Sequence, residues 1–590
     1  QNPSGASITE NLAWMLEFHR RESKPVFWKL FDRLGQDEQE LLDDLDCLAY
    51  CQRTERAPFR IKQSLGYEYR FDPSQEFKVA SSYYVLGEEN SSGKRVKVTL
   101  EKSQSDLTNG LFVLKAKKDV PPDVITLVPD EYVRPDPIPE AIFDVVKAYE
   151  KNTLGKCAIL DFLGRDIPRI RGHASGSAIV EGKTPRENLQ AIVQTITALD
   201  NSYLPIQGPP GSGKTYTGKY LITELLRQGK RVGICSNSHQ ALNNLLLATS
   251  KQCKHDSVDA QFMCTKNTSA ELEALDIVVG KNQDLASFVQ DRCVVGTTAW
   301  GFARNDMAKK LDYLFVDEAG QVSVANLVAI SRSADNLVLL GDQMQLGQPI
   351  QGSHPAESGA STLDYLLQDR ATIGKDRGVF LDVTYRMHSS VNAFISEAVY
   401  ESKLSSDSSN DYQVVAVPSN YSGPLNKDSG IFFFAVEHHG NAQASDEEIV
   451  VVVELVQQLL GRLFTAKDGS QRSLDWEDFL FVAPYNLQVN KLSQALARLP
   501  SGERAKVGSV DRFQGQEAPI VILSMCASDA NESPRGLGFL FDKNRLNVAI
   551  SRAQCMAIVV ANPKLANTEA RNVKELGQVN MFSQLLKYSS

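Results

Sequence analysis

The hydrophobic pattern along the chain changes character near residue 173. Beyond that point, short apolar runs are followed by glycine-containing turns and then by amphipathic stretches, and this order repeats. Strand, turn and helix in alternation are typical of parallel α/β sheets. The pattern forms two blocks, at 173–365 and 366–590, and a polar stretch at about 246–290 interrupts the first block. We therefore predict an α/β protein with two such domains, the first carrying a small helical insertion.

The N-terminal part has a different texture. Residues 1–60 are predicted to form a helical stalk, in which Phe27 and Phe31 share one face and the aromatic side chains pack into a helix core. From 61 to 135, short alternating stretches separated by turns indicate a small β-barrel. Residues 136–172 begin with closely spaced prolines and are predicted to hold a second stalk helix and a linker.

Composition narrows the class of protein. A hydrophobic fraction of 42% and a charged fraction of 23% are ordinary for globular proteins. No apolar run reaches the roughly eighteen residues that a membrane span needs, so we expect no membrane partner. The net charge of −9 excludes a generally basic surface, and nucleic acid would have to bind in a local groove. Nine cysteines without framework spacing favour a reducing, cytoplasmic compartment.

The strongest local motif is a glycine-rich segment between a short apolar run, Tyr203–Ile206, and a helical pattern that starts at Tyr216. Glycines there let backbone N–H groups turn inward around phosphate oxygens at the positive end of the helix. Lys214 would reach the β- and γ-phosphates of ATP, and the Thr215 hydroxyl would bind Mg²⁺. The residues expected to surround the phosphates are Gly208, Pro209, Pro210, Gly211, Ser212, Gly213, Lys214 and Thr215.

A phosphate loop of this kind works with acidic residues on a second strand. The apolar run Leu314–Val316 leads directly into Asp317 and Glu318. At the end of a buried strand, Asp317 would lie beside Mg²⁺ and Glu318 could polarise the attacking water. The two motifs together predict a site that hydrolyses a nucleoside triphosphate.

Four further segments narrow the family: Gly341–Leu346, Tyr385–His388, Val510–Glu517 and Arg545–Ala553. In order and spacing, the full set of motifs resembles the superfamily 1B helicases, in their Upf-like and Dna-two-like branch. The resemblance is strong over 173–575. The helix–barrel–helix pattern before it is similar to the stalk and barrel of that branch. The resemblance implies two RecA-like P-loop domains preceded by a stalked β-barrel domain.

The same resemblance implies roles for residues around the nucleotide. Gln190, upstream of the glycine-rich loop, corresponds to a glutamine that reads adenine, and Tyr385 to a tyrosine that stacks on it. Gln345 resembles the residue that senses the γ-phosphate. Asp342 is expected to bridge this motif to the metal shell.

Two arginines are similar to the arginine fingers of the family, Arg386 and Arg552, both delivered from the second α/β block. A planar guanidinium offers fixed donors to the charge that develops on the transferred phosphoryl group. Glu517 resembles the acid that binds the ribose or positions a finger. ATP would then lie between the two blocks and close them, and hydrolysis would let them reopen.

Short polar side chains fall where this family touches the nucleic-acid strand. Hydroxyl and amide groups suit hydrogen bonds to phosphate, and Tyr485 could offer a base its ring. Ordinary packing of Tyr485 and a core position for Thr297 remain alternatives, and His438 and His439 are interpreted as surface residues. The expected contacts are Ser236, Asn237, His239, Thr297, Thr298, Pro484 and Tyr485.

The resemblance implies an ATP- and Mg²⁺-dependent helicase that moves 5′ to 3′ on single-stranded nucleic acid, with DNA favoured and RNA second. An ATP-gated clamp that does not unwind, and a P-loop enzyme acting on a small molecule, are the alternatives. Leu16–Pro25 resembles the join between a RecB-like nuclease and a helicase of this branch. We therefore expect any nuclease domain or partner to lie upstream of Gln1.

Overall fold

The structure is a computed structural model that describes residues 7–589 except 43, 45, 74, 76, 117, 118, 183, 532 and 534. It divides into two compact units. One unit consists of residues 17–135 together with 350–355, and the other contains the α/β domains. Within the described part of the chain, no helix combines the length and the apolar character needed to span a bilayer.

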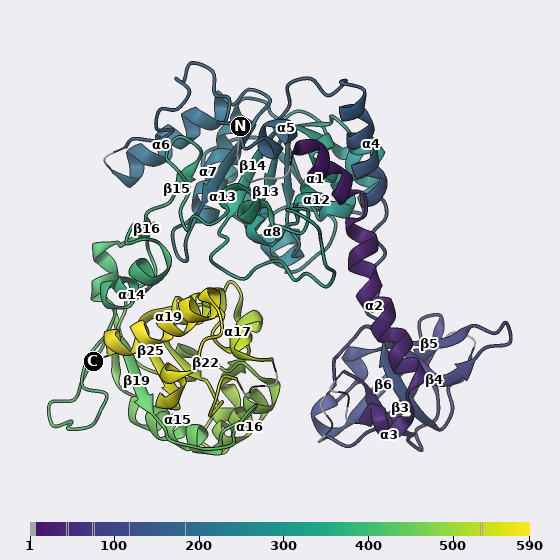
Figure 1. Cartoon of the computed structure of the whole chain (residues 1–590), viewed down its shortest axis with the longest axis vertical. Helices are drawn as coiled ribbons and strands as arrows, with labels where there is room; N and C mark the ends of the chain where they lie inside the picture. Colours follow the sequence, from purple (N-terminus) through teal and green to yellow (C-terminus); the bar gives the residue numbers. More distant parts are fainter. Residues whose placement is uncertain are drawn as a thin grey trace. The chain divides into compact units, whose positions relative to one another are not determined.

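The smaller unit contains a closed antiparallel barrel (Figure 1). Its strands follow one another in the order β1-β7-β4-β5-β6-β3, and β3 pairs with β1 to complete the ring. Inward side chains alternate along the strands, as in β5, where Val96, Val98 and Leu100 are buried. The predicted barrel is therefore confirmed. The six strands are β1 (Leu48–Arg53), β3 (Ser64–Arg70), β4 (Ser82–Glu89), β5 (Arg95–Leu100), β6 (Leu111–Ala116) and β7 (Val124–Pro129), and the short β2 (Phe59–Ile61) pairs with β3.

The predicted helical stretch up to residue 60 is wrong in its last part. Helices α2 (Phe18–Gly35) and α3 (Glu38–Leu42) form, but Leu48–Arg53 is strand β1. Its residues pair with β7 and β3, and such tertiary pairing overrides local helix propensity.

The aromatic side chains of α2 pack into a core only in part: Phe18 is 3% exposed, but others lie on the surface. Trp28 is 72% exposed and Phe31 is 52% exposed. Arg33 also anchors the helix: it is 4% exposed, and its Nε donates to the Asp44 carboxylate at 2.6 Å. Arg33 also pairs with Asp46. Leu30 on the same helix packs with Leu41, Cys47 and Val128, so apolar packing and the ion pairs together hold the helix while the aromatic face stays exposed.

The first α/β domain has an eight-stranded sheet, in the order β11-β10-β12-β9-β13-β14-β8-β15, in which all pairings are parallel. Helices α6 (Pro185–Thr197), α7 (Lys214–Arg227) and α8 (His239–His255) pack on one face. The central strands are buried on both faces, which explains their continuous apolar runs. The strands are β8 (Tyr203–Gln207), β9 (Val232–Cys235), β10 (Gln261–Cys264), β11 (Val278–Val279), β12 (Cys293–Thr297), β13 (Leu311–Val316), β14 (Ala334–Gly341) and β15 (Val379–Phe380).

Two predictions for this domain are corrected. The stretch 246–290 is not a helical insertion, because it contributes β10 and β11 to one edge of the sheet. Buried Phe262, Met263 and Cys264 join β10 to the common core, although polar neighbours hide this run in the sequence. The domain also extends beyond the predicted boundary at 365, since β15 pairs with β8.

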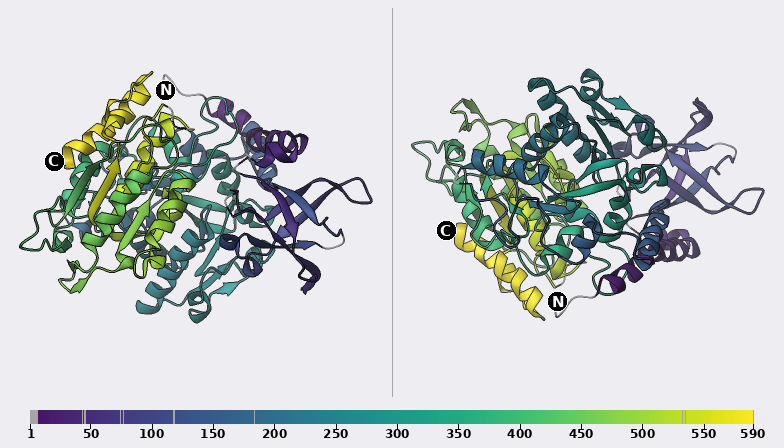
Figure 2. Two further views of the ribbon diagram at one scale, coloured as in Figure 1. Left: turned by 90° about the horizontal axis from the view of Figure 1, so that it is seen from below. Right: turned by 90° about the horizontal axis from the view of Figure 1, so that it is seen from above.

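The second α/β domain has a five-stranded parallel sheet in the order β19-β25-β24-β22-β23. Alternate residues of β24 face opposite cores: Val521 and Leu523 pack with α14 (Ser389–Val399), whereas Ile520 and Ile522 pack with α15 (Asp446–Leu459). The C-terminal helix α19 (Val573–Ser589), in yellow, lies beside this sheet in Figures 1 and 2. The strands are β19 (Gly430–Ala435), β22 (Phe479–Val482), β23 (Lys506–Gly508), β24 (Ala518–Ser524) and β25 (Ala553–Ala561).

Candidate nucleotide-binding site

The glycine-rich loop joins the end of β8 to the start of α7. Gly211 and Gly213 have φ angles of +72° and +83°, which residues with a side chain rarely adopt. Lys214 is the first residue of α7, and its Nζ donates to the Gly208 carbonyl at 2.7 Å. The Lys214 side chain thus folds back onto its own loop. The loop also lies at the N-terminus of α7, where the helix dipole favours anions.

Asp317 and Glu318 follow directly after β13. The Asp317 N–H donates to the carbonyl of Cys235 at the end of the neighbouring strand β9, at 2.7 Å. The Asp317 carboxylate accepts from the Glu318 N–H at 3.0 Å and is buried. Burial and the charge of Glu318 raise the pKa of Asp317 to about 7, against the opposing effect of Lys214. A nearby cation would stabilise the ionised form of such a carboxylate, which is the property expected of a Mg²⁺ ligand.

Two buried polar atoms have no hydrogen-bond partner among the described residues of the site, Ser212 Oγ and Arg552 Nε. Orphaned buried donors are rare in folded proteins, because each one costs free energy. One lies on the phosphate loop and the other on the expected finger of the second domain. Phosphate oxygens would satisfy both donors, so the residues present fit a bound triphosphate.

The second domain touches the loop through the segment that follows β15. The Tyr385 N–H donates to the Gly211 carbonyl at 2.9 Å, and Thr384 Oγ1 donates to the Pro210 carbonyl at 2.9 Å. A Cβ atom placed on Gly211 would stand 2.5 Å from the Cβ of Arg386. The Cβ of Arg386, from which its side chain extends, therefore lies beside the phosphate loop.

The Arg386 side chain is held within the second domain. Its Nε donates to the Glu517 carboxylate, and its Nη1 donates to the Ser551 carbonyl at 3.1 Å. Although burial opposes the effect, the charge of Arg386 and its hydrogen bond lower the pKa of Glu517. Glu517 is therefore placed to position the guanidinium.

Arg552 is 5% exposed, and its Nη1 donates to the Gln516 carbonyl at 2.9 Å. Burial, together with repulsion from Arg386, lowers the pKa of Arg552 to about 10, and Glu318 and Glu517 act in the opposite direction. Arg552 is thus close enough to Glu318 and Arg386 to feel both charges. Of the two expected fingers, Arg386 thus starts beside the loop, and Arg552 lies within electrostatic range of Arg386 and Glu318.

Gln345 and Asp342 connect this region to the second domain. Gln345 Nε2 donates to the Asp342 carboxylate at 2.9 Å and approaches the Gly208 carbonyl at 3.4 Å. The buried Asp342 also accepts from the Tyr400 hydroxyl at 2.6 Å. Asn547, on α18 (Lys543–Ile550), donates to the Met344 carbonyl at 2.7 Å. Asp342 therefore links the two domains, and its expected role at the metal shell stays a prediction.

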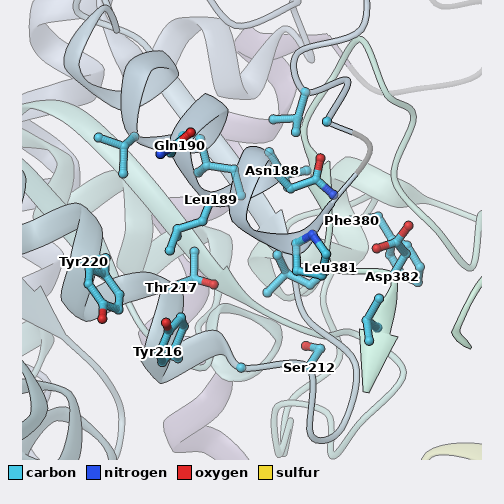
Figure 3. A pocket seen from close by; sticks show the side chains of 18 of the residues that line it. Asn188, Leu189, Gln190, Ser212, Tyr216, Thr217, Tyr220, Phe380, Leu381 and Asp382 are labelled. Carbon is cyan, nitrogen blue, oxygen red and sulfur yellow. The ribbon is translucent and has the colours of Figure 1, made fainter. Parts of the chain in front are cut away.

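A pocket of about 1940 Å³ opens beside the loop. Gln190 and Tyr385, the residues expected at adenine, both line it together with Ser212. Figure 3 shows Gln190 and Asn188 on α6, across the pocket from Tyr216 and Tyr220 of α7. Sequence reasoning missed Tyr216, although its place directly after the Gly-Lys-Thr motif was a signal.

Two of the residues expected at the nucleic acid are core residues in this structure. Thr297 is fully buried, and its hydroxyl donates to Asn282 at 2.8 Å. Tyr485 is 6% exposed, its hydroxyl pairs with Ser533, and its ring packs on Phe539. The alternatives of core position and ordinary packing therefore describe these two residues better than nucleic-acid contact.

The other expected contacts differ in their exposure. Ser236 is 1% exposed, and its hydroxyl accepts from the Ser238 N–H at 3.4 Å, so it offers the strand little surface. The remaining four are half-buried or exposed, and their contact with nucleic acid stays a prediction. They are Asn237, His239, Thr298 and Pro484.

The interpretation of His438 as a surface residue is wrong. Its side chain is fully buried, with Nδ1 at 2.7 Å from Ser528 Oγ and Nε2 at 3.0 Å from Glu448. No local pattern around His438 signals this network, because Glu448 and Ser528 come from α15 and the segment after β24.

Comparisons with known proteins agree with this geometry. Two family models, each described as an AAA domain, match residues 187–364 and 360–564. The putative helicase mov-10-B.1 of Danio rerio is 27% identical over 415 residues, which cover 61% of this chain and 40% of that protein. The regulator of nonsense transcripts 1 homolog of Drosophila melanogaster is 26% identical over 424 residues, which cover 65% of this chain and 35% of that protein.

The DNA replication ATP-dependent helicase/nuclease dna2 of Schizosaccharomyces pombe is 26% identical over 410 residues, or 65% of this chain and 27% of that protein. This chain thus spans between 27% and 40% of the length of these three relatives. The helicase motifs, the two α/β sheets and these relatives together identify the family. The chain belongs to the superfamily 1B helicases, in their Upf-like and Dna-two-like branch.

Proposed function

We propose that this protein is an ATP-driven motor that moves 5′ to 3′ along single-stranded nucleic acid, with DNA as the favoured track. The observation that carries the proposal is the meeting of two domains at one loop. Gly211 of the first domain accepts a hydrogen bond from the Tyr385 N–H, Arg386 starts beside Gly211, and the charge of Glu318 acts on Arg552. A ligand in this position would link the two domains.

Each residue has a separate task in this proposal. Lys214 and the backbone of the loop bind the β- and γ-phosphates, and Gln345 senses the γ-phosphate through Gly208. Glu318 accepts a proton from the attacking water. Thr215 and Asp317 would hold Mg²⁺, which neutralises charge on the transferred phosphoryl group.

Arg386 and Arg552 would stabilise the negative charge of the transition state. Arginine fingers contribute about 10³–10⁵ in rate in related chemistry. Because they come from the second domain, hydrolysis needs the two domains to be closed around ATP. Release of phosphate would remove the partner of both guanidinium groups, and the domains would reopen. Repeated closing and opening is the proposed motor stroke.

The choice of DNA rests on the relatives and on the N-terminal join. One relative is named as a DNA replication helicase/nuclease, whereas another is named for nonsense transcripts, so RNA is the second candidate. Leu16–Pro25 resembles a nuclease–helicase join, and we propose that a nuclease domain or partner acts with this chain in the cytoplasm. DNA cutting by this chain itself, lost on mutating one of its acids, would contradict that assignment.

The test compares ATP hydrolysis with single-stranded DNA and RNA of equal length across a salt series, because phosphate contacts make binding salt-dependent. Strand displacement is then measured on duplexes with a 5′ or a 3′ tail. We expect stimulation by DNA above RNA and displacement from the 5′ tail. Hydrolysis without displacement on either substrate would indicate an ATP-gated clamp.

A further inference from the structure

Arg386 lies in a short stretch of backbone between strand β16 (Val383–Thr384) and helix α14. Residues 385–387 belong to neither element, so their carbonyl groups lie beyond the strand ladder and before the first turn of the helix. Backbone carbonyls in such a stretch need partners from elsewhere. Where these partners come from decides how firmly the backbone of Arg386 is fixed.

The side chain of Asn410 is bonded to both ends of this stretch. Asn410 is fully buried in the short helix η7 (Ser408–Tyr412). Its Nδ2 donates to the Thr384 carbonyl at 2.9 Å and to the Met387 carbonyl at 3.1 Å. One amide group therefore joins the two ends of the stretch 384–387.

Lys467 holds the stretch from a different part of the second domain. It lies in the turn between strands β20 (Leu463–Thr465) and β21 (Gln471–Ser473). Its Nζ donates to the Tyr385 carbonyl at 3.0 Å and to Asn410 Oδ1 at 2.8 Å. The ammonium group therefore also orients the Asn410 amide, because Oδ1 is the end of the amide that accepts.

Gln413 pairs with the carbonyl of the arginine itself. Gln413 is 4% exposed, and its Nε2 donates to the Arg386 carbonyl at 2.8 Å. Each of the four successive carbonyls from 384 to 387 thus accepts a hydrogen bond from a side chain of the second domain. We call Asn410, Gln413 and Lys467 the carbonyl cradle.

Water could have satisfied part of this stretch. Tyr385 is 41% exposed, so solvent reaches its surroundings. A lysine side chain pairs with its carbonyl instead, although ordering a lysine costs conformational entropy. This arrangement favours a task in fixing the backbone over the simple satisfaction of a polar group.

We propose that the carbonyl cradle positions Arg386 for catalysis by fixing the backbone from which its side chain extends. The inference rests on the proposed role of Arg386 in ATP hydrolysis and adds three positioning residues to it. The guanidinium is held separately, by Glu517 and the Ser551 carbonyl. Misplacing a catalytic group by about 1 Å can cost on the order of 10²-fold in rate, so turnover depends on the cradle.

The test is a double-mutant cycle on ATP hydrolysis in the presence of single-stranded DNA. The single variants are Asn410→Ala, Lys467→Met and Arg386→Ala, and each cradle variant is also combined with Arg386→Ala. Tyr412→Ala is the matched control, since Tyr412 belongs to the same helix η7 but is 63% exposed. Melting temperatures identify the folded variants. Lys467, whose side chain is 36% exposed, provides the test if Asn410→Ala unfolds.

Asn410→Ala and Lys467→Met should each lower kcat about 10- to 100-fold and change the KM for ATP less than about threefold, because the finger acts in the transition state. In the Arg386→Ala background, the same substitutions should lower kcat less than about threefold further, since no finger remains to be positioned. Tyr412→Ala should have wild-type kinetics.

Four outcomes would contradict these expectations. Wild-type kcat in the folded cradle variants would overturn the inference. So would losses that persist in full in the Arg386→Ala background, because the cradle would then act independently of the finger. A rise in KM alone would overturn it too, since Lys467 would then contact ATP itself. If Arg386→Ala hydrolysed ATP at the wild-type rate, the proposed role of Arg386 would fail, and the inference with it.

Discussion

Gly211 of the phosphate loop lies so close to Arg386 of the second domain that a Cβ atom added to the glycine would stand 2.5 Å from the arginine Cβ. The same atom would stand 2.6 Å from Thr384 Oγ1. Real Cβ atoms do not approach other atoms this closely. The glycine is therefore needed for the contact between the domains as well as for the turn.

Gly211→Ala should lower ATP hydrolysis at least about tenfold, because the methyl group pushes the second domain and its arginine away from the loop. Part of any effect comes from the positive φ, which costs an alanine roughly 1–2 kcal/mol. Gly229→Ala is the matched control, since Gly229 has φ +81° but open space around it. Steady-state kinetics of both variants separate the two causes, and equal losses would contradict the role of the contact.

Lys214→Ala and Glu318→Gln should fail at different steps. Without Lys214, the phosphates lose their cation, and ATP affinity should fall at least tenfold. Glu318→Gln should bind ATP like the wild type, but hydrolyse it about 10²–10⁴-fold more slowly, because the proton of the attacking water has no acceptor. Binding and single-turnover measurements check both. Wild-type turnover in Glu318→Gln would show that another residue is the base.

Tyr400→Phe should weaken the link between the domains. The buried hydroxyl donates to Asp342 and accepts from Asn547, so its loss leaves two buried groups short of a partner. We expect a loss of about 1–3 kcal/mol in the free energy of unfolding. Chemical denaturation measures it, with Tyr412→Phe as an exposed control. A loss as small as that of the control would mean that the hydroxyl contributes little.

Asp46→Asn should show how the stability conferred by the ion pairs of the stalk helix depends on pH. Burial alone would raise the pKa of Asp46, but Lys29 and Arg33 lower it to about 2. A carboxylate whose pKa is lower in the folded chain than in the unfolded chain stabilises the fold at pH values above the unfolded pKa of 3.8. This stabilisation is lost as the pH falls to about 2. The wild type should therefore be more stable than Asp46→Asn at neutral pH, and their melting temperatures should converge between pH 4 and 2. A constant difference would contradict the ion pair.

The nucleotide site could be predicted from the sequence because its motifs are local. The glycine spacing fixes the turn between β8 and α7, and Lys214 is the first helical residue, as the pattern indicates. Asp317 likewise follows a strand whose apolar run is continuous. The six motifs, in the order typical of the family, then supported the prediction of two α/β domains.

The errors come from contacts between residues far apart in the chain. Leu48–Arg53 and Gln261–Cys264 are strands because distant strands pair with them, and their local composition does not show it. His438 is buried because Glu448 and Ser528 meet it in the folded domain. Trp28 is exposed because Leu30 and Arg33 hold the helix by other faces, and the Arg33 ion pair is not visible in a pattern of apolar residues.

The central claim is that the second domain supplies guanidinium groups to a triphosphate held by the first. Arg552→Gln tests it most directly, because glutamine keeps a donor for the Gln516 carbonyl but has no charge. The measurement is the single-turnover rate of ATP hydrolysis in the presence of single-stranded DNA. We expect a fall of about 10³-fold or more, with ATP affinity changed less than tenfold. A folded variant that hydrolyses ATP within tenfold of the wild-type rate would contradict the claim.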